Sequence, residues 1–490
     1  MLKRRDFITS VAAIAGTGGI LGLKAHATEL QTGTRDTSQI ANVIDFGATG
    51  DGKTNDTEAM RAAHATGRIV YYPAGEYRFT SLEMRTGGII GEGKNTILTC
   101  TDSGEQHAIT HTLEDPDSVL INERGALFRD FLLRYENEQK NGTGINLIPS
   151  KFSDGNPVEN YTSYISNVTI RNFSTCIKTS LVSYMNIENC YFVNFRDFGI
   201  HSDMNNETFA DNGDNGFINN YFFTSPKYSN AICVRYRAGG LRFIGNKVNG
   251  GLIGVDISPN QSSSVVLINS NSIENQTNTG IRFFVYPEDT AAREFGRIVI
   301  ANNQLNLAAT EGSAISINSQ VNDFKLNDVN ITGNTIYAAR TSANLIDLRG
   351  VDRFNVVANQ CYAHAAASSG VYVHANCSNG NVEANSIMGT ALGEVINYSD
   401  TVTVNGIKAK VTERILLPTL LAGEVYEGQV NIQQAGFSDE CIVLWNIDGQ
   451  GLDLKAWVSS PGQVKYRIAN STANDFASTE VAQTFVIRRV

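Results

Sequence analysis

The sequence is poor in the residues and patterns that define several large classes of protein. Its 490 residues include only nine prolines, two tryptophans and seven cysteines. No two cysteines form the Cys-x-x-Cys pair that is typical of zinc and redox sites. No apolar run beyond the N-terminus reaches the roughly 18 residues that a membrane-spanning helix needs. Basic runs are also absent after the first residues, and the formal net charge is −10, which argues against nucleic acid as the main partner.

The first 27 residues predict an export signal. They hold a basic triplet, an apolar stretch rich in Gly and Ala, and a small-residue cleavage site, at 3–5, 11–23 and 25–27 respectively. This is the pattern of a twin-arginine leader. We therefore expect a mature protein that begins near Thr28, is periplasmic or secreted, and has no membrane association once the leader is removed. Because such cargo folds in a reducing compartment, the cysteines are predicted to be free and mostly buried.

One short pattern, apolar-any-any-Asn-any-apolar, recurs seven times in the middle of the chain. Its asparagines are Asn220, Asn246, Asn271, Asn303, Asn334, Asn359 and Asn385, so the steps between them are 26, 25, 32, 31, 25 and 26 residues. A period in this range is typical of a solenoid, and the apolar residues alternate as they do in short β-strands. The pattern predicts an all-β fold, a single-stranded right-handed parallel β-helix over residues 28–405, with the asparagines in a buried structural ladder.

The N-terminal end of the predicted β-helix holds a distinctive segment. Residues 42–59 read Asn-Val-Ile-Asp-Phe-Gly-Ala-Thr-Gly-Asp-Gly-Lys-Thr-Asn-Asp-Thr-Glu-Ala, and Val-Tyr-Tyr-Pro-Ala-Gly-Glu-Tyr follows at 70–77. Asp56 can N-cap a helix over 57–65 that ends at Gly67. Such a helix would cover the open strand edges, which makes about residues 40–70 an N-terminal cap.

This segment, with Gly-Ile-Ile-Gly-Glu-Gly at 88–93, resembles the opening of pectate-lyase-3-type β-helix proteins. That group includes phage tailspike depolymerases and bacterial enzymes that degrade or modify polysaccharides. The resemblance implies the β-helix fold and a polysaccharide as substrate. It also implies a homotrimer, since tailspike-type helices often associate side by side.

The asparagine repeat stops near residue 400, and the last part of the chain has another character. Apolar strands alternate around turns such as Asp448-Gly449 and Pro461-Gly462. This pattern predicts a small antiparallel β-sandwich over residues 410–490. Capping the β-helix or driving assembly is favoured for it over binding a glycan.

The spacing of the repeat also predicts which side chains share an outer face. A further strand follows each asparagine by 9 to 12 residues, and the positions one and three after its apolar anchor should point outward. Taken coil by coil, these positions hold His201 and Asp203, Cys233 and Arg235, Asp256 and Ser258, Arg282 and Phe284, Ser316 and Asn318, Asp347 and Arg349, Tyr372 and His374, and Asn397 and Ser399.

This polar stripe suits a long acidic or polyhydroxylated polymer. Arginines pair with the carboxylates of a uronate, and Phe284 and Tyr372 can stack on sugar rings. The predicted substrate-binding residues are His201, Asp211, Phe284, Asn318, Asp347, Arg349, Tyr372 and His374. Rows of alternating Asp and Arg are, however, also what ordinary surface ion pairs produce.

Hydrolysis of a glycosidic bond requires two carboxyl groups. Asp203 and Asp256 lie two predicted coils apart, which is roughly 10 Å along the axis at the usual strand spacing. Asp214, in the Gly-rich loop 211–216 with Asp211, can overhang the same groove. We therefore predict an exported enzyme that cleaves an exopolysaccharide or capsular polysaccharide by glycoside hydrolysis, with catalytic candidates Asp203, Asp256, Asp214, Arg235 and Arg282.

Three alternatives stay open at this point. The first is β-elimination on a uronate polymer, for which Arg235, Arg282, His201 or His374 could act as the base. The second is a non-catalytic protein that binds or assembles polysaccharide on the same scaffold, and the third is a surface adhesin. No acid cluster indicates a calcium site, and neither a metal nor a cofactor is predicted.

Overall fold

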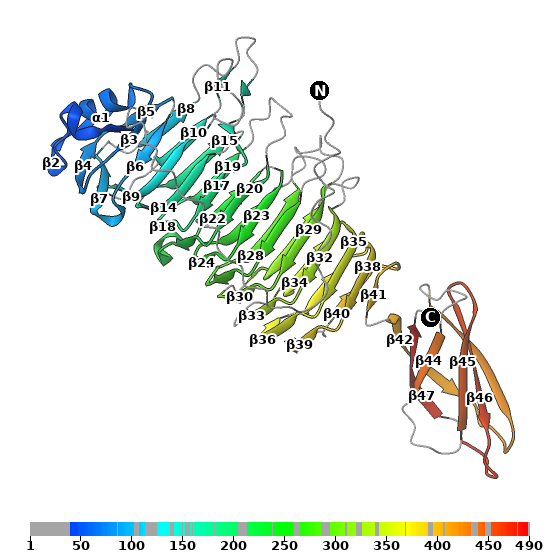
Figure 1. Cartoon of the computed structure of the whole chain (residues 1–490). Helices are drawn as coiled ribbons and strands as arrows, with labels where there is room; N and C mark the ends of the chain where they lie inside the picture. Colours follow the sequence, from blue (N-terminus) through cyan, green and yellow to red (C-terminus); the bar gives the residue numbers. More distant parts are fainter. Residues whose placement is uncertain are drawn as a thin grey trace, which may run out of the picture. The chain divides into compact units, whose positions relative to one another are not determined.

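The computed structural model describes residues 40–85, 87–101, 107–112, 125–137, 142–148, 150–151, 157–158, 160–161, 163–180, 182–203, 213–237, 239–258, 265–285, 295–308, 311–319, 326–338, 343–367, 369–390, 395–404, 407–432, 440–445, 452–477 and 479–488. These residues form a right-handed parallel β-helix and a group of antiparallel strands that follows it (Figure 1). The predicted fold class is confirmed. The predicted leader lies outside the described residues.

Each central coil of the β-helix contains three strands. The first strands are β17 (Asn186–Glu188), β20 (Asn215–Ile218), β23 (Leu241–Ile244), β26 (Val266–Asn269), β29 (Phe295–Ala301), β32 (Leu326–Thr332), β35 (Val351–Val357), β38 (Ser378–Glu383) and β41 (Thr403–Val404). The second strands are β18 (Tyr191–Val193), β21 (Tyr221–Phe223), β24 (Lys247–Asn249), β27 (Ser272–Glu274), β30 (Gln304–Leu307), β33 (Thr335–Ala338), β36 (Gln360–Ala367) and β39 (Ser386–Thr390). The repeat asparagines lie at the corner between these two sets.

The third strands form a parallel sheet of 12 strands among the described residues. In chain order they are β5 (Leu82–Met84), β8 (Ile109–Thr112), β10 (Thr143–Ile148), β15 (Thr175–Ser180), β19 (Phe198–Asp203), β22 (Ile232–Tyr236), β25 (Ile253–Ile257), β28 (Thr279–Val285), β31 (Ile315–Ser319), β34 (Ile346–Arg349), β37 (Val371–Val373) and β40 (Val395–Asn397). Each strand pairs only with its neighbours in this order, so one coil follows another without crossing. This sheet carries the predicted polar stripe.

The remaining elements lie at the N-terminal end and in short connections. The N-terminal coils contain β1 (Ile40–Asn42), β2 (Asp51–Asn55), β3 (Ile69–Tyr71), β4 (Gly75–Phe79), β6 (Gly88–Ile90), β7 (Thr96–Cys100), β9 (Leu127–Tyr135) and β14 (Tyr164–Arg171), with 3-10 turns at Val43–Phe46 and Gly93–Asn95. Short strands β11 (Ser150–Lys151), β12 (Pro157–Val158), β13 (Asn160–Tyr161) and β16 (Val182–Ser183), and a 3-10 turn at Pro226–Tyr228, join the coils.

The seven repeat asparagines form the buried ladder that their spacing predicts. Asn246 Oδ1 accepts hydrogen bonds from the backbone N and Nδ2 of Asn220, at 2.8 and 3.1 Å. Asn271 Oδ1 accepts from Asn246 in the same way, and the chain continues through Asn303, Asn334, Asn359 and Asn385. Each Nδ2 also donates to a backbone carbonyl of the preceding coil, as Asn246 does to Phe217 at 2.8 Å. The ladder therefore ties every central coil to the next one.

The interior beside the ladder is apolar. A single cluster of buried side chains extends from Ala41 to Val402, and it includes Phe217, Phe222 and Phe243. All seven cysteines are free; six are buried and Cys441 is half-buried, which confirms the expectation for the thiols. Among the described residues no helix is long and apolar enough to cross a membrane.

The predicted N-terminal cap is present with one local difference. Helix α1 (Thr57–His64) contributes buried Met60 and Ala63 to the core of the β-helix, and it is followed by Gly67 at φ +72°. Asp56 occupies the N-cap position, but its carboxylate does not bond to the helix. It accepts hydrogen bonds from the backbone nitrogens of Thr49 and Gly50, at 2.8 and 3.2 Å. The expected side-chain cap by Asp56 was therefore wrong, because the preceding loop offers it other donors.

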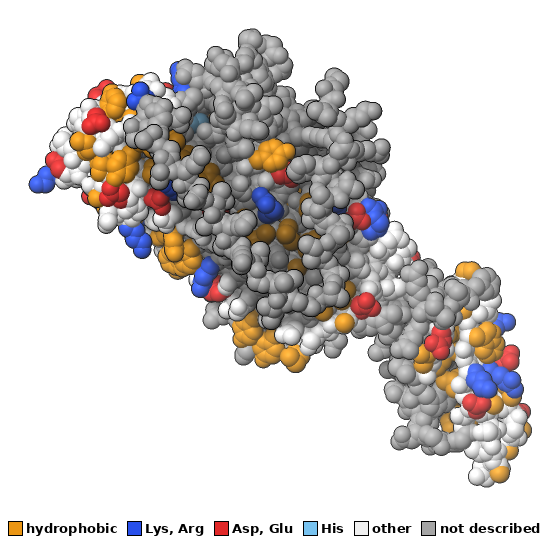
Figure 2. Space-filling model, in the orientation of Figure 1, with side chains coloured by type: hydrophobic (Ala, Val, Ile, Leu, Met, Phe, Trp, Pro, Cys, Tyr) orange, Lys and Arg blue, Asp and Glu red, His pale blue; other side chains and the backbone are white. Residues whose placement is uncertain are grey.

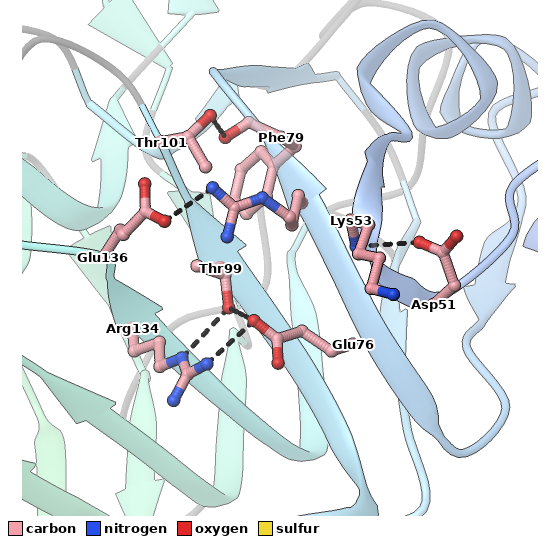
Figure 3. Close-up of polar contacts among 9 residues, drawn as sticks. Asp51, Lys53, Glu76, Phe79, Thr99, Thr101, Arg134 and Glu136 are labelled. Carbon is pink, nitrogen blue, oxygen red and sulfur yellow. Dashed lines mark hydrogen bonds and ion pairs between the residues drawn. The ribbon is translucent and has the colours of Figure 1, made fainter.

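The outer face of the N-terminal coils carries a network of charged groups (Figure 3). Glu76 Oε1 lies 2.8 Å from Arg134 Nη2 and accepts a hydrogen bond of 2.8 Å from Thr99 Oγ1. Arg78 Nη2 lies 2.6 Å from Glu136 Oε1. Partial burial acts to raise the pKa of Glu76, but the hydrogen bonds from Arg134 and Thr99 and the charges of Arg134 and Arg78 outweigh it, so the pKa is lowered from 4.5. The network thus favours the ionised carboxylate.

The C-terminal strands form the predicted sandwich. One sheet contains β42 (Ile407–Leu417), β44 (Glu440–Trp445) and β47 (Thr479–Arg488), and the other contains β43 (Val425–Asn431), β45 (Leu452–Ser460) and β46 (Gln463–Asn470). All pairings within both groups are antiparallel. Residues from both sheets share a small core of their own, which includes Val430, Tyr466 and Phe485. On the face drawn in Figure 2, acidic and basic side chains are interspersed over this part.

We predict that Asn271→Ala lowers the free energy of unfolding by about 2–4 kcal/mol. The substitution removes the acceptor of two buried N–H groups of Asn246 and the donor to the Phe243 carbonyl, and each buried group without a partner costs about 1–3 kcal/mol. Chemical denaturation measures the change. Asn306→Ala, on the outer face of β30, is the matched control and should change the stability by less than 0.5 kcal/mol, about the usual surface effect. Equal effects of the two substitutions would contradict the ladder's role.

We predict that the Glu76 network makes stability depend on pH in the acidic range. Because the pKa of Glu76 is lower in the folded state, its contribution is present above the ordinary value of 4.5 and is lost as the pH falls through the folded pKa. Unfolding free energies between about pH 6 and pH 3 should therefore fall less steeply for Glu76→Gln than for the unsubstituted protein. Glu83→Gln, on the exposed position of β5, should leave the slope unchanged. A slope that Glu76→Gln does not alter would exclude this linkage.

Candidate functional site

The third-strand sheet aligns the outward side chains of successive coils in two rows. The first row, in register, is Lys178, His201, Arg235, Asp256, Arg282, Ser316, Asp347 and Tyr372. The second row, two residues further along each strand, includes Phe284, Asn318, Arg349 and His374. We call these twelve residues the outer stripe. Most of the residues predicted from the sequence as substrate-binding are therefore brought together.

Two strands are shifted by one residue from the predicted register. Val234, not Ile232, lies opposite Ile200, so Cys233 points inward and is fully buried. At the far end Asn397 lies opposite the buried Val373 and so falls out of the row. The predictions that Cys233 and Asn397 point outward were wrong, because the turns before β22 and β40 differ in length by one residue from those of their neighbours.

The predicted carboxylates occupy different places. Asp203 ends β19 in the second row and so is not in register with Asp256, which lies in the first row; its side chain lies outside the described residues. Asp211 also lies outside them. Asp214 is exposed and directly precedes β20, a first strand whose neighbours are β17 and β23. The structure thus does not bring Asp214 into the outer stripe.

Asp256 is the most buried charged residue of the outer stripe and binds two arginines. Its side chain is 1% exposed, whereas those of Arg235 and Arg282 are 26% and 25% exposed. Arg282 donates from Nε and Nη2 to the two carboxylate oxygens, each at 2.8 Å, and Arg235 Nε donates to Oδ2 at 3.1 Å. A carboxylate held in this way orients both guanidinium groups on the surface.

Aromatic rings support the same two arginines. The Arg235 Cζ atom lies 5.2 Å from the ring centroid of Phe198, and His201 stacks on that ring at 4.3 Å. On the next side the Arg282 Cζ atom lies 5.5 Å from the ring centroid of Phe284. Each guanidinium is therefore placed between an aromatic face and the buried carboxylate, which restricts its rotamers before any ligand arrives.

A second cluster lies further along the outer stripe. His374 Nε2 is 3.0 Å from Asp347 Oδ1 and 3.2 Å from Arg349 Nη2, and the Tyr372 ring centroid lies 4.6 Å from the imidazole. Burial lowers the pKa of His374 below 6.5, with Asp347 acting against this and Arg349 reinforcing it. Burial also raises the pKa of Tyr372 above 10, and Tyr398 and Asp347 add to the effect. At neutral pH the pair is thus a neutral imidazole beside a protonated phenol.

Two atoms beside this cluster have chemistry to spare. Within the described part of the chain, Arg349 Nε and Asn318 Oδ1 are buried polar atoms without a hydrogen-bond partner. The two residues lie opposite each other on β34 and β31. A donor and an acceptor that are left in this state suit a polar ligand. No group of three or more metal-ligating side chains occurs among the described residues.

Sequence reasoning missed three members of this surface. Lys178 extends the first row by one coil, and its anchor Ile177 could have been counted from Phe173, which occupies the asparagine position of that coil. Phe198 supports Arg235 from a position that looks like an ordinary core residue in the sequence. Tyr398 packs on Tyr372 at 5.6 Å and was hidden by the one-residue shift in β40.

Comparisons with known proteins agree with this architecture. Residues 40–284 match the model of the family described as rhamnogalacturonase A/epimerase, pectate lyase-like. The fold is similar to a mutant tailspike protein of E. coli bacteriophage HK620 in complex with a pentasaccharide, with a TM-score of 0.60 and 13% identity over 94% of this chain and 97% of that one. Another mutant of that tailspike, in complex with a hexasaccharide, gives 0.57 and 14% over 92% and 94%.

Two curated sequences are similar over a short segment. Alginate lyase 7 of Azotobacter vinelandii is 42% identical over 69 residues, which are 13% of this chain and 8% of that protein. Mannuronan C5-epimerase AlgE3 of the same organism is 44% identical over 69 residues, 13% of this chain and 4% of that protein. The chain thus matches less than a tenth of the length of these relatives.

We predict that Asp256→Ala lowers the free energy of unfolding by about 3 kcal/mol, because it leaves two guanidinium groups facing each other without their buried partner. A double-mutant cycle with Arg282→Met, followed by chemical denaturation, should give a coupling energy of at least about 1 kcal/mol. The control is Asp328→Ala, whose carboxylate binds Arg353 while both side chains are about half exposed. That substitution should cost no more than about 1 kcal/mol. Equal costs for the two aspartates would contradict this account.

Proposed function

We propose that this chain, which belongs to the rhamnogalacturonase A/epimerase, pectate lyase-like family, cleaves a uronate-containing polysaccharide that lies along the outer stripe. The observation that carries the proposal is the pair of arginines held by the buried Asp256. Arg235 and Arg282 keep a quarter of their surface exposed, and each guanidinium has N–H donors beyond those that Asp256 accepts. The trio has a formal charge of +1, on a chain with a net charge of −10.

A carboxylate-bearing polymer fits this local charge better than a neutral one. Lys178 adds a further positive charge to the first row, and Arg349 adds one to the second. Arg–carboxylate pairs are directional and bidentate, so a row of them can select a uronate and set its orientation. Phe284 and Tyr372 offer ring faces to pyranoses on the same surface. The similarity of a short segment to an alginate lyase and a mannuronan C5-epimerase supports the same class of substrate.

For the chemical step we favour β-elimination. The neutral His374 removes the proton from the carbon next to the uronate carboxylate, and Arg349 neutralises the charge that develops on that carboxylate. The electron pair of the broken C–H bond forms a C=C bond to the neighbouring carbon, and the glycosidic C–O bond there breaks. Tyr372, whose raised pKa keeps it protonated, gives its proton to the leaving oxygen. The Asp347 carboxylate, 3.0 Å from Nε2, stabilises the imidazolium that forms.

Hydrolysis, which the sequence analysis favoured, has less support in this geometry. It rested on Asp203 and Asp256 as a pair of carboxyls. Asp256 is buried and both of its oxygens accept hydrogen bonds from arginines, so it is poorly placed to protonate a leaving group. The reaction type is therefore a part of the proposal that an experiment must decide.

Two further parts of the proposal concern the whole protein. Residues 1–27 would direct export by the twin-arginine route, which would place the mature protein in the periplasm or outside the cell. The likeness of the fold to a phage tailspike supports side-by-side association into a homotrimer. The sandwich would then cap the β-helix or contribute to assembly.

We predict that incubation with uronate polymers such as alginate and polygalacturonate releases new reducing ends together with the ultraviolet absorbance of an unsaturated uronate. His374→Gln should lower kcat by at least 100-fold, at the low end of the usual effect of a general base. Arg282→Met should mainly raise KM, because it removes a binding contact. The rate should be lost as the pH falls below 6.5 and His374 becomes protonated.

Arg242→Met, on the exposed face of β23 outside the outer stripe, is the matched control and should leave both constants unchanged. Reducing ends without absorbance would replace elimination by hydrolysis. Binding of the polymer without either signal would replace the enzyme by a binding protein. Absence of binding to all acidic polymers would overturn the proposal as a whole.

A further inference from the structure

A cavity of about 880 Å³ lies on a different face of the β-helix, in its last coils. First strands β32, β35, β38 and β41 line it, and no residue of the outer stripe takes part. Its volume is within the range of about 300–1,000 Å³ that is usual for small-ligand sites. The sequence analysis did not point to this place, because it took only the third strands as a candidate surface.

A row of amide side chains crosses the cavity. Asn330, Asn355 and Asn381 lie opposite one another on three successive coils, and Thr403 follows on the fourth. Asn355 Nδ2 donates to Asn330 Oδ1 at 2.9 Å, and Thr403 Oγ1 donates to Asn381 Oδ1 at 3.0 Å. These contacts orient the row, and each amide can both donate and accept. A surface with alternating donors and acceptors at the coil spacing matches the hydroxyl groups of a sugar chain.

The charge of the cavity separates it from the outer stripe. Arg353 binds Asp328 through Nε at 2.8 Å and Asp352 through Nη1 at 2.9 Å, so its positive charge is compensated locally. Glu383 and Asp400 also line the cavity. Three carboxylates and one guanidinium among the lining residues sum to a formal charge of −2. A uronate polymer is repelled here, whereas hydroxyl groups can donate to the carboxylates.

We infer that this cavity is a second glycan site, separate from the outer stripe, and that it binds an uncharged oligosaccharide through the amide row. The inference stands apart from the proposed cleavage reaction, because it uses other residues and a ligand of other charge. The neutral sugars would come either from uncharged stretches of the processed polymer or from another glycan. Their chemistry of recognition is the same in both cases.

Isothermal titration with linear hexasaccharides of glucose, galactose, mannose and N-acetylglucosamine tests the inference. At least one should bind, and the double variant Asn355→Ala/Asn381→Ala should weaken that binding at least 10-fold with an unchanged melting temperature. Asn306→Ala, on the outer face of β30 and outside the cavity, should bind as the unsubstituted protein does. Arg282→Met should also keep the neutral ligand, which separates this site from the outer stripe even if the cleavage proposal fails.

Three results would overturn the inference: no binding of any neutral hexasaccharide at millimolar concentration, equal affinity of the double variant, or loss of neutral binding in Arg282→Met. Oligouronates provide the opposite arm of the experiment. The double variant should bind them as the unsubstituted protein does, and a loss of oligouronate binding there would also count against a site for uncharged sugars. Competition by the intact acidic polymer would identify its own neutral stretches as the source of the ligand.

Discussion

The alignment of successive coils is the constraint on which the other features of this protein depend, and the buried asparagine ladder maintains it. Each asparagine between Asn246 and Asn359 accepts the backbone N–H and the side-chain amide of one coil and donates to the next asparagine and to a carbonyl. A coil that slipped by one residue would leave these buried groups without partners, and it would also turn its apolar residues outward. Polar ladder and apolar core therefore select the same register.

A fixed register converts scattered residues into surfaces. On the third-strand sheet it places Arg235, Asp256 and Arg282 on three consecutive strands, about one strand spacing of 4.8 Å apart. At that spacing one carboxylate can bind both arginines. Burial of Asp256 would be costly for a lone charge, but two directional partners offset that cost and leave each guanidinium oriented toward solvent. A structural ion pair and a ligand-binding pair of arginines are thus the same arrangement seen from its two sides.

The β-helix presents surfaces of different charge on different faces, although every coil repeats the same backbone. The third strands carry a predominantly basic row, and the first strands of the last coils carry amides and carboxylates. Because the core side chains point inward on all three sides, the outward positions are free to vary without loss of stability. This separation permits one scaffold to hold an acidic polymer on one side and uncharged sugars on another, as the two proposals require.

The sequence by itself determined the solenoid, the ladder and most of the outer stripe, because alternation and the asparagine period are local signals that recur in every coil. They were sufficient to pair Arg282 with Phe284, Asp347 with Arg349 and Tyr372 with His374. Only the tertiary structure decided the register of Cys233 and Asn397, since it depends on turn lengths between coils. It also decided the two-arginine environment of Asp256 and the cavity of the last coils. These features arise from contacts between residues more than 20 positions apart, which no local pattern contains.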